Sequence, residues 1–363
     1  MRVFLYVLIL YLSVWITNEY SILSFPIEFN FLYLLPQILL LSFVYAFITR
    51  AKKKSHQVDI LEWVIPITKL SIVLSLIVLI ITLPANGRDA KLEIISNNIV
   101  LYYLNMFNSS MLIVILSSMF QPCRSIVNKK VFFYIIFAII AFSLTNLSRS
   151  MAFYFIIAIC MSGLKFDIEK KKIISWGMVL IVVMILMPIF QGRTDNVEGA
   201  LVRSILNIVF YVSYSFGLGE YLIKETHLSG ISWGYFGYVL SKILNEPLTS
   251  NIFFDNKYLY EFIQLGKSDI YGLLNANVMY PLWATVYADF GLFSFIPYLF
   301  TFFIIVTSYF MRAYILFSWL FFRFAILGFL VSPVLFRDII FEIVVVLAFE
   351  IFIRKNKRIC ADE

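Results

Sequence analysis

The chain has 363 residues, of which 61% are hydrophobic and only 14% are charged, and its mean hydropathy is +0.90. A soluble globular domain cannot bury that much apolar surface, so the composition excludes one and predicts an integral membrane protein. The net charge of +7 does not indicate nucleic-acid binding, because the basic residues fall in short loops where a membrane topology explains them.

A membrane-spanning helix needs about 20 apolar residues, and the sequence predicts an all-α integral membrane protein with about ten such helices. In chain order, the spans are expected at residues 3–18, 29–48, 62–84, 99–120, 131–147, 149–164, 173–190, 282–310, 313–333 and 338–353. The stretch 142–150 is long enough only for a tight external turn, so the fifth and sixth spans are expected to form a helical hairpin.

Four regions follow from these apolar runs. An N-terminal transmembrane bundle of about seven helices covers 1–190, and a large loop with short interfacial helices covers 191–281. A C-terminal bundle of about three helices covers 282–353, and a basic tail covers 354–363. Within the loop, residues 200–221 are apolar enough to dip into the membrane. Arg203 and two glycines favour an interfacial or re-entrant helix there over a full span.

The distribution of basic residues predicts the orientation. One set of short loops collects most of them, including Lys52–Lys54 and Lys170–Lys172, whereas the opposite short loops hold few. By the positive-inside rule, the basic side is cytoplasmic, and an even number of spans places both termini there. The large loop then lies outside a bacterial inner membrane, in the periplasm. Such a segment exceeds what a transporter needs and suits an enzyme that acts on a lipid-linked substrate.

Cofactor motifs are not apparent in the sequence. The three cysteines fall in or beside segments expected in the membrane or the cytoplasm, so we expect neither a disulfide nor a structural metal. The sequence has no phosphate-binding Walker loop, no glycine-rich dinucleotide fingerprint and no zinc spacing. We therefore expect no cofactor, and we do not expect this chain to bind ATP as a source of energy.

Arginines at the expected outer boundary are the first candidates for a site. Guanidinium groups bind phosphate oxygens in a bidentate manner, and a lipid pyrophosphate presents its phosphates at that depth. The alternative is that these side chains are anchors that mark the ends of helices. The candidates are Arg149 before the sixth span, Arg193 after the seventh, Arg203 in the loop and Arg337 before the last span, with Arg88 as a weaker fifth.

Acidic and aromatic residues complete the candidate site. Asp289 opens the Asp-Phe-Gly run at the entry to the eighth span and is a candidate general base, or else a helix-terminal charge that faces water. Eleven other external acids, Glu220 among them, cannot be ranked from sequence. Trp233 and Tyr287 flank the loop ends, where aromatic rings stack on sugars or form an interfacial belt.

The order of these motifs resembles that of the O-antigen polymerase (Wzy) family. The resemblance covers about half of the chain and rests on several loose motifs. They are Ser148-Arg149-Ser150 at the hairpin, Arg193 at the start of the long loop, Asn277-Val278-Met279-Tyr280 with Tyr287-Ala288-Asp289-Phe290-Gly291 at its end, and the turn from Ser332 to Arg337. The Arg-x10-Gly pattern of some members is missing, because Ser204 and Tyr214 stand where the glycines would be.

The resemblance implies a GT-C-like glycosyltransferase. It would join undecaprenyl-pyrophosphate-linked oligosaccharide units at the periplasmic leaflet without a metal, with a flippase and a chain-length regulator as partner proteins. The catalytic residues would be Arg193, Arg337 and Asp289. The substrate-binding residues would be Arg149, Arg203, Arg88, Trp233 and Tyr287. The alternatives are a lipid-linked oligosaccharide flippase and an O-antigen ligase, although His227 lacks the following Asn that ligases usually carry.

Overall fold

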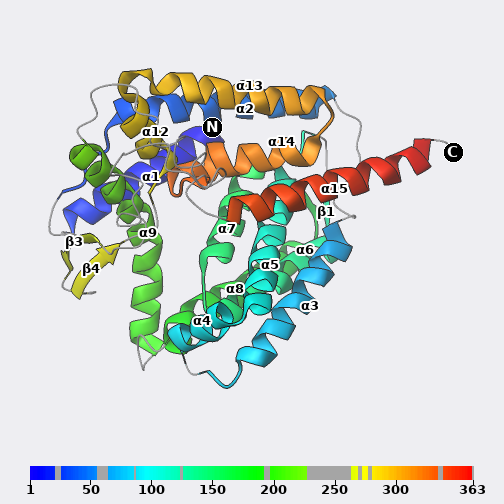
Figure 1. The fold of residues 1–363 in the computed structure, drawn as a ribbon, viewed down its shortest axis with the longest axis horizontal. Coiled ribbons are helices and arrows are strands. Elements are labelled where there is room, and N and C mark those ends of the chain that lie inside the picture. Colours follow the sequence, from blue (N-terminus) through cyan, green and yellow to red (C-terminus); the bar gives the residue numbers. More distant parts are fainter. Residues whose placement is uncertain are drawn as a thin grey trace. The chain divides into compact units, whose positions relative to one another are not determined.

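The fold is mostly helical (Figure 1). The chain comprises two compact units, each assembled from segments that are far apart in sequence. The first unit contains Met1–Ala46, Leu206–Thr307 and Arg323–Phe336, and the second contains Phe47–Ile205, Ser308–Phe322 and Arg337–Glu363. This computed structural model describes residues 1–20, 26–54, 64–85, 87–122, 126–191, 197–226, 263–268, 272–276, 280–333 and 338–361. The division into bundles, loop and tail that the sequence suggests stays a prediction.

The elements run in the following order. The N-terminal half contains α1 (Arg2–Glu19), α2 (Phe31–Lys54), α3 (Val64–Thr82), α4 (Arg88–Asn97), α5 (Ile99–Ser117), η2 (Ser118–Phe120), β1 (Ile126–Asn128), α6 (Lys129–Asn146), α7 (Ser150–Ser162), β2 (Lys165–Asp167) and α8 (Lys170–Phe190). The C-terminal half contains α9 (Val197–Thr226), β3 (Ile263–Ser268), β4 (Gly272–Ala276), α12 (Leu282–Phe290), η4 (Gly291–Ser294), α13 (Phe295–Phe310), α14 (Tyr314–Leu320), η5 (Phe321–Ile326), η6 (Leu327–Phe329) and α15 (Asp338–Ala361).

Seven helices among the described residues are long and apolar enough to cross a membrane. They are Arg2–Glu19, Phe31–Lys52, Val64–Thr82, Ile99–Phe120, Lys129–Asn146, Lys171–Phe190 and Gly291–Phe310. Six of them coincide with expected spans, and Gly291–Phe310 covers the second part of the span expected at residues 282–310. Two further expected spans fall on the shorter apolar helices Ser150–Ser162 and Tyr314–Phe329. The structure is therefore compatible with the expected multi-pass membrane protein, while the total of ten spans stays a prediction.

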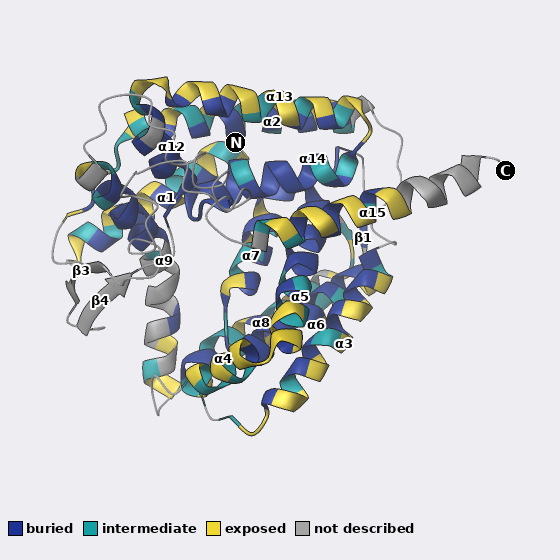
Figure 2. Cartoon of the chain, in the orientation of Figure 1, coloured by how far each residue is buried: buried dark blue, intermediate teal, exposed yellow. Residues whose placement is uncertain are grey.

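The exposed faces of these helices are apolar, as a lipid environment requires. Figure 2 shows exposed residues along α3 and α13, and on α13 they include Phe300 and Phe303 at 62% and 56% exposure. On α8, Ile181 and Val182 are similarly exposed. Apolar side chains in such long exposed rows would drive a soluble protein to aggregate, whereas hydrocarbon solvates them at no cost.

The structure corrects the expectation for residues 282–310. They do not form one span, because Gly291 adopts φ +53° and ends α12, and α13 begins only at Phe295 after a short 3-10 turn. A positive φ is cheap for glycine and costly for other residues, so this glycine interrupts the helix. The apolar run continues through the break, which is why hydropathy alone could not detect it.

The mostly helical structure is compatible with the expected all-α class, and it also contains two short strand pairs. β1 pairs in parallel with β2, Ile126 opposite Lys165, and β3 pairs antiparallel with β4, Ile263 opposite Ala276. The loop region also contains α9, which is 30 residues long and covers the helix expected at residues 200–221. Strands of three to six residues are too short to establish a periodicity in the sequence, so tertiary contacts decide where they form.

The second unit is built around α5, which contacts α3, α4, α14 and α15. Its N-terminus is capped by Asn98, whose side chain accepts hydrogen bonds from the backbone N–H groups of Val100 and Leu101. Deeper in the helix, Asn108 accepts from the Ser71 hydroxyl at 2.5 Å and donates to the Ser75 hydroxyl at 2.8 Å. These bonds tie α5 to α3 where lipid supplies no alternative partner.

The same polar chain continues to the end of α6. The Thr145 hydroxyl donates to the Ser75 carbonyl at 2.9 Å, and Asn105 and Asn146 exchange hydrogen bonds at 2.7 and 3.0 Å. A reciprocal amide pair of this kind fixes the rotation of both helices. The C-terminus of α6, and therefore the turn that follows it, is held by α3 and α5 together.

The first unit packs α9 against α1, α12 and the segment after η6. The Ser213 hydroxyl donates to the Ser13 carbonyl at 2.9 Å and accepts from Thr17. Two turns further on, Gly219 faces Trp283, which is 2% exposed. A Cβ atom at residue 219 would lie 2.6 Å from the indole ring, closer than atoms can approach. Only glycine allows α9 and α12 to come this close.

We predict that Gly219→Ala destabilises the protein, because the rigid, enclosed indole of Trp283 must move to admit the methyl group. Overpacking of this kind costs about 1–3 kcal/mol. Thermal unfolding of the purified protein in detergent should show a lower melting temperature. The matched control is Gly177→Ala on α8, where no atom lies within 4 Å of the new Cβ. That variant should have an unchanged free energy of unfolding, or one that is higher by roughly 0.5–1 kcal/mol because alanine has a higher helix propensity than glycine. Equal melting temperatures for the two variants would contradict the packing argument.

Candidate functional site

The turn between α6 and α7 carries the first candidate arginine. It comprises Leu147 to Ser150, which we call the arginine turn, and Leu147 adopts the left-handed conformation at φ +45°. The Ser148 and Ser150 hydroxyls lie 3.0 Å apart, and the backbone N–H of Ser150 points at the Ser148 hydroxyl at 3.4 Å. The expected tight turn is present, and it places Arg149 directly at the N-terminus of α7.

Arg149 is buried against a neighbouring helix. Its side chain is 9% exposed, and its guanidinium donates to the Ser204 hydroxyl of α9 at 3.2 Å. Ser204 in turn donates to the Met184 carbonyl of α8 at 3.3 Å. One serine hydroxyl therefore joins α7, α8 and α9, and it fixes the position of an otherwise flexible arginine side chain.

A second contact ties the end of α8 to the same turn. The side-chain N–H of Gln191 donates to the Leu147 carbonyl at 2.5 Å. The other side-chain atom, Oε1, is buried and has no hydrogen-bond partner among the described residues. A buried acceptor without a partner is costly, and a bound hydroxyl group is one way to satisfy it.

These contacts bring the arginine turn, the C-terminal end of α8 and the N-terminal part of α9 together in the second unit. Arg149 lies in the arginine turn, Arg203 immediately precedes Ser204 on α9, and Arg193 follows Gln191 by two positions in the sequence. A helix N-terminus carries partial positive charge and unbonded N–H groups. Together with a guanidinium and an unpaired amide oxygen, it suits a ligand that has both an anionic group and a hydroxyl group, such as a sugar phosphate.

The structure describes only some of the remaining predicted site residues. Arg88 is the first residue of α4 and is half-buried, and its Nε has no hydrogen-bond partner among the described residues. Tyr287, on α12, lies 4.3 Å from Tyr33, measured between the ring centroids. Arg203 and Asp289 lie in α9 and α12, and their side chains are outside the described part of the structure. Arg193, Arg337 and Trp233 also lie outside the described residues.

The first unit contains a buried acid that the sequence could not distinguish from the others. Glu220 of α9 is 6% exposed, and neither carboxylate oxygen has a hydrogen-bond partner among the described residues. Lys224, one turn later, lies 3.8 Å from one of these oxygens and is itself largely exposed. Burial raises the pKa of Glu220 to about 7, although Lys224 opposes the shift. The only hint in the sequence is that Glu220 interrupts an apolar run.

The described residues were also compared with the requirements of a metal site. Within the described ranges, no three His, Cys, Asp or Glu side chains come together in the way a metal site requires. Two other buried acids, Glu342 and Glu350 of α15, accept hydrogen bonds from neighbours. Glu342 accepts from the Trp319 indole at 2.7 Å, and Glu350 accepts from the Ile315 backbone N–H at 2.9 Å. Both therefore help to hold α14 on α15.

The raised pKa of Glu220 predicts a pH-dependent stability. Below about pH 4.5 the carboxyl group is protonated in both the folded and the unfolded chain, so it makes no difference. As the pH rises towards 7, the unfolded chain releases the proton while the folded protein retains it, so the folded state loses stability, by about 2 kcal/mol. Glu220→Gln should therefore raise the melting temperature at pH 8 and leave it unchanged at pH 4. Glu93→Gln, at an exposed position of α4, is the control and should show no such pH dependence.

The comparisons with known proteins give no relatives from which function could be transferred. No protein-family model matches the sequence, and no curated protein and no solved structure is detectably similar to it. The function is therefore inferred from the arginine turn, its hydrogen-bond partners and the motifs in the sequence.

Proposed function

We propose that the chain is a membrane glycosyltransferase that polymerises undecaprenyl-pyrophosphate-linked oligosaccharide units into O-antigen or a related surface polysaccharide. The growing chain is transferred from its lipid pyrophosphate onto the incoming lipid-linked unit at the periplasmic leaflet of the inner membrane. The protein has a GT-C-like fold with both termini in the cytoplasm. The motif order from the arginine turn to Arg337 supports this assignment, as does the long loop region between α8 and α12.

The observation that carries the proposal is the buried Arg149, held by Ser204, which follows Arg203 in the sequence. A pyrophosphate leaving group gains negative charge as the glycosidic bond breaks, and a fixed guanidinium in a poorly hydrated site stabilises that charge. Because Ser204 and the arginine turn preorganise the side chain, little reorganisation is needed during the reaction. Gln191 supplies an acceptor for a sugar hydroxyl next to the same turn.

The proposed roles follow the sequence motifs. Arg193 and Arg337 contact the donor pyrophosphate, and Arg149, Arg203 and Arg88 bind phosphate oxygens. Asp289 accepts the proton of the acceptor hydroxyl, while Trp233 and Tyr287 stack on sugar rings. Each lipid anchor confines its substrate to the membrane plane, so the protein needs to align the two reactants in fewer dimensions. The reaction consumes no nucleotide sugar, because the lipid pyrophosphate is the activated donor.

The two buried acids of α15 give the transporter alternative no specific support. An ion-coupled flippase would use intramembrane acids that change their protonation or partners during transport. Glu342 and Glu350 are instead engaged with the indole and backbone N–H groups of α14. Their contacts account for their burial, so neither acid favours transport over glycosyl transfer.

The function can be tested with Arg149→Ala in a strain that lacks the chromosomal gene. Loss of a buried charge-assisted contact costs about 1.5–3 kcal/mol, which corresponds to roughly a 10–100-fold slower reaction. We expect the surface polysaccharide ladder to collapse to single-unit capped lipid. Arg149→Lys should restore it only partly, because an ammonium group cannot bind two phosphate oxygens in a fork. Arg50→Ala, at an exposed position of α2, should leave the ladder intact.

Other outcomes would separate the alternatives. Long lipid-linked chains that fail to reach the core lipid would indicate a ligase. Unit lipids trapped on the cytoplasmic side would indicate a flippase. A full-length ladder from Arg149→Ala, with the variant present in the membrane at the normal level, would contradict the proposed role of the arginine turn.

A further inference from the structure

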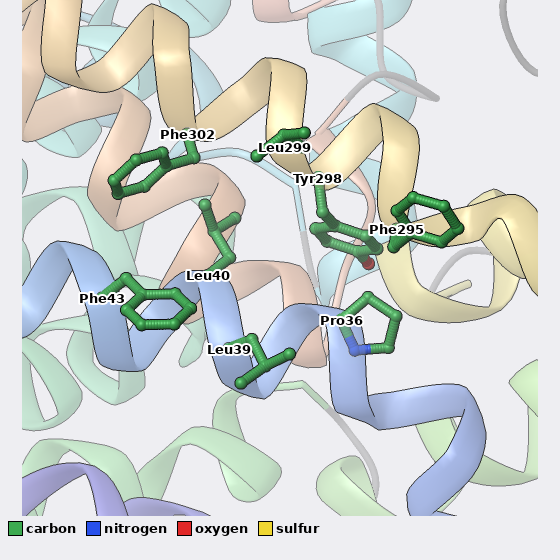
Figure 3. A pocket seen from close by; sticks show the side chains of 8 residues that line it. All are labelled: Pro36, Leu39, Leu40, Phe43, Phe295, Tyr298, Leu299 and Phe302. Atoms are coloured by element: carbon green, nitrogen blue, oxygen red, sulfur yellow. The ribbon is translucent and has the colours of Figure 1, made fainter.

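A long apolar groove runs between α2 and α13 in the first unit (Figure 3). The two helices lie side by side, and both belong to the group that is long and apolar enough to cross a membrane. Their backbones are separated by facing aromatic side chains, as in the pair Phe43 and Phe302, whose ring centroids lie 6.3 Å apart. The groove has a volume of about 390 Å³ and is lined by Pro36, Leu39, Leu40, Phe43, Phe295, Tyr298, Leu299 and Phe302.

The floor of the groove is fixed by a buried polar contact beneath it. The Tyr298 hydroxyl donates to Oε1 of Gln37 at 2.8 Å, and the Gln37 amide donates to the Phe324 carbonyl at 3.2 Å. Gly328 packs against Gln37 so closely that a Cβ atom there would lie 2.6 Å from the amide nitrogen. The phenol hydroxyl is therefore directed away from the groove, and Tyr298 contributes its ring to the lining.

The chemistry of the lining limits what can occupy it. All eight lining residues contribute hydrocarbon or ring surface, and the one hydroxyl among them is bound to Gln37. The walls are open to the surroundings, with Leu39 at 43% exposure and Leu299 at 50%, while the floor residue Leu40 is 3% exposed. A groove of this depth on a membrane-facing surface is filled by a hydrocarbon chain, since neither water nor a polar headgroup would find a partner there.

We propose that this groove binds the unsaturated isoprenoid chain of a polyprenyl lipid. A straight acyl chain has many rotatable bonds and loses much conformational entropy when a fixed groove holds it. An isoprenoid chain of the same length has fewer, because each isoprene unit contains one methyl-bearing double bond about which the chain does not rotate. The four aromatic rings of the lining present flat faces for these planar segments. The identity of the attached headgroup rests on the proposed function, whereas chain binding does not.

The test uses the purified full-length protein in nanodiscs and a polyprenol that carries a diazirine near the end of its chain. Ultraviolet irradiation should label peptides of α2 and α13, and mass spectrometry locates the label. Unlabelled polyprenol should compete. A tenfold larger amount of dioleoyl phospholipid should not. Equal competition by phospholipid would show that the groove holds ordinary membrane lipid, and it would overturn the proposal.

Variants test the groove itself. Leu299→Trp fills it from α13, and Leu39→Trp fills it from α2, so each should reduce labelling at least tenfold. Phe300→Trp is the matched control, because Phe300 is adjacent on α13, 62% exposed and outside the lining. Its labelling should equal that of the unaltered protein. Unchanged labelling in either groove variant that elutes as a monodisperse protein would also overturn the proposal.

The outcome is independent of polymer growth. Polyprenol has no phosphate, so Arg149→Ala should label as strongly as the unaltered protein even where it abolishes the polysaccharide ladder. If a protein without polymerase activity is still labelled, the groove proposal stands and only the proposed enzymatic function is refuted. If the protein has polymerase activity but is not labelled by polyprenol, the proposed function stands and the groove proposal is refuted.

Discussion

The absence of hydrogen-bond partners in hydrocarbon is the constraint on which the structure depends. Every polar side chain inside the apolar helices must find its partner within the protein, and each such pair then holds two helices together. In the second unit, Asn108 bonds to Ser71 and Ser75 of α3, and the Asn105–Asn146 pair joins α5 to α6. In the first unit, Gln37 performs the same role beneath Tyr298. Apolar packing alone gives little orientation in a lipid environment, so these few bonds set the rotation of the helices.

The arginine turn takes its geometry from that polar scaffold. Asn146 is the last residue of α6, and its amide pair with Asn105 fixes the point at which the chain turns. From there, Gln191 holds the Leu147 carbonyl and Ser204 holds Arg149. A guanidinium that is both buried and oriented is worth more for stabilising developing charge than one that moves freely in water. The contacts that make the helices pack are therefore the same contacts that prepare the candidate anion site.

In the first unit, the size of the side chains where helices cross decides how closely the helices approach. Gly219 lets α9 lie directly on Trp283, and Gly328 lets its backbone approach Gln37. Where α2 and α13 meet, bulky rings keep the helices apart and leave a groove instead. The size of the side chain at each crossing thus decides whether two helices pack tightly or leave space for a hydrocarbon chain.

Local composition was sufficient to predict the class of protein and its main elements. Apolar runs of about 20 residues located seven helices that the structure contains, and the short stretch before Ser150 located the hairpin turn, because both depend on local composition. The sequence also identified Arg149 as a candidate. It could not detect the break at Gly291, which a continuous apolar run conceals, or the short strands, which have no measurable period. Long-range contacts bring Ser204 and Gln191 to the arginine turn and bury Glu220, and no local pattern could predict either, since burial and pairing depend on residues distant in the chain.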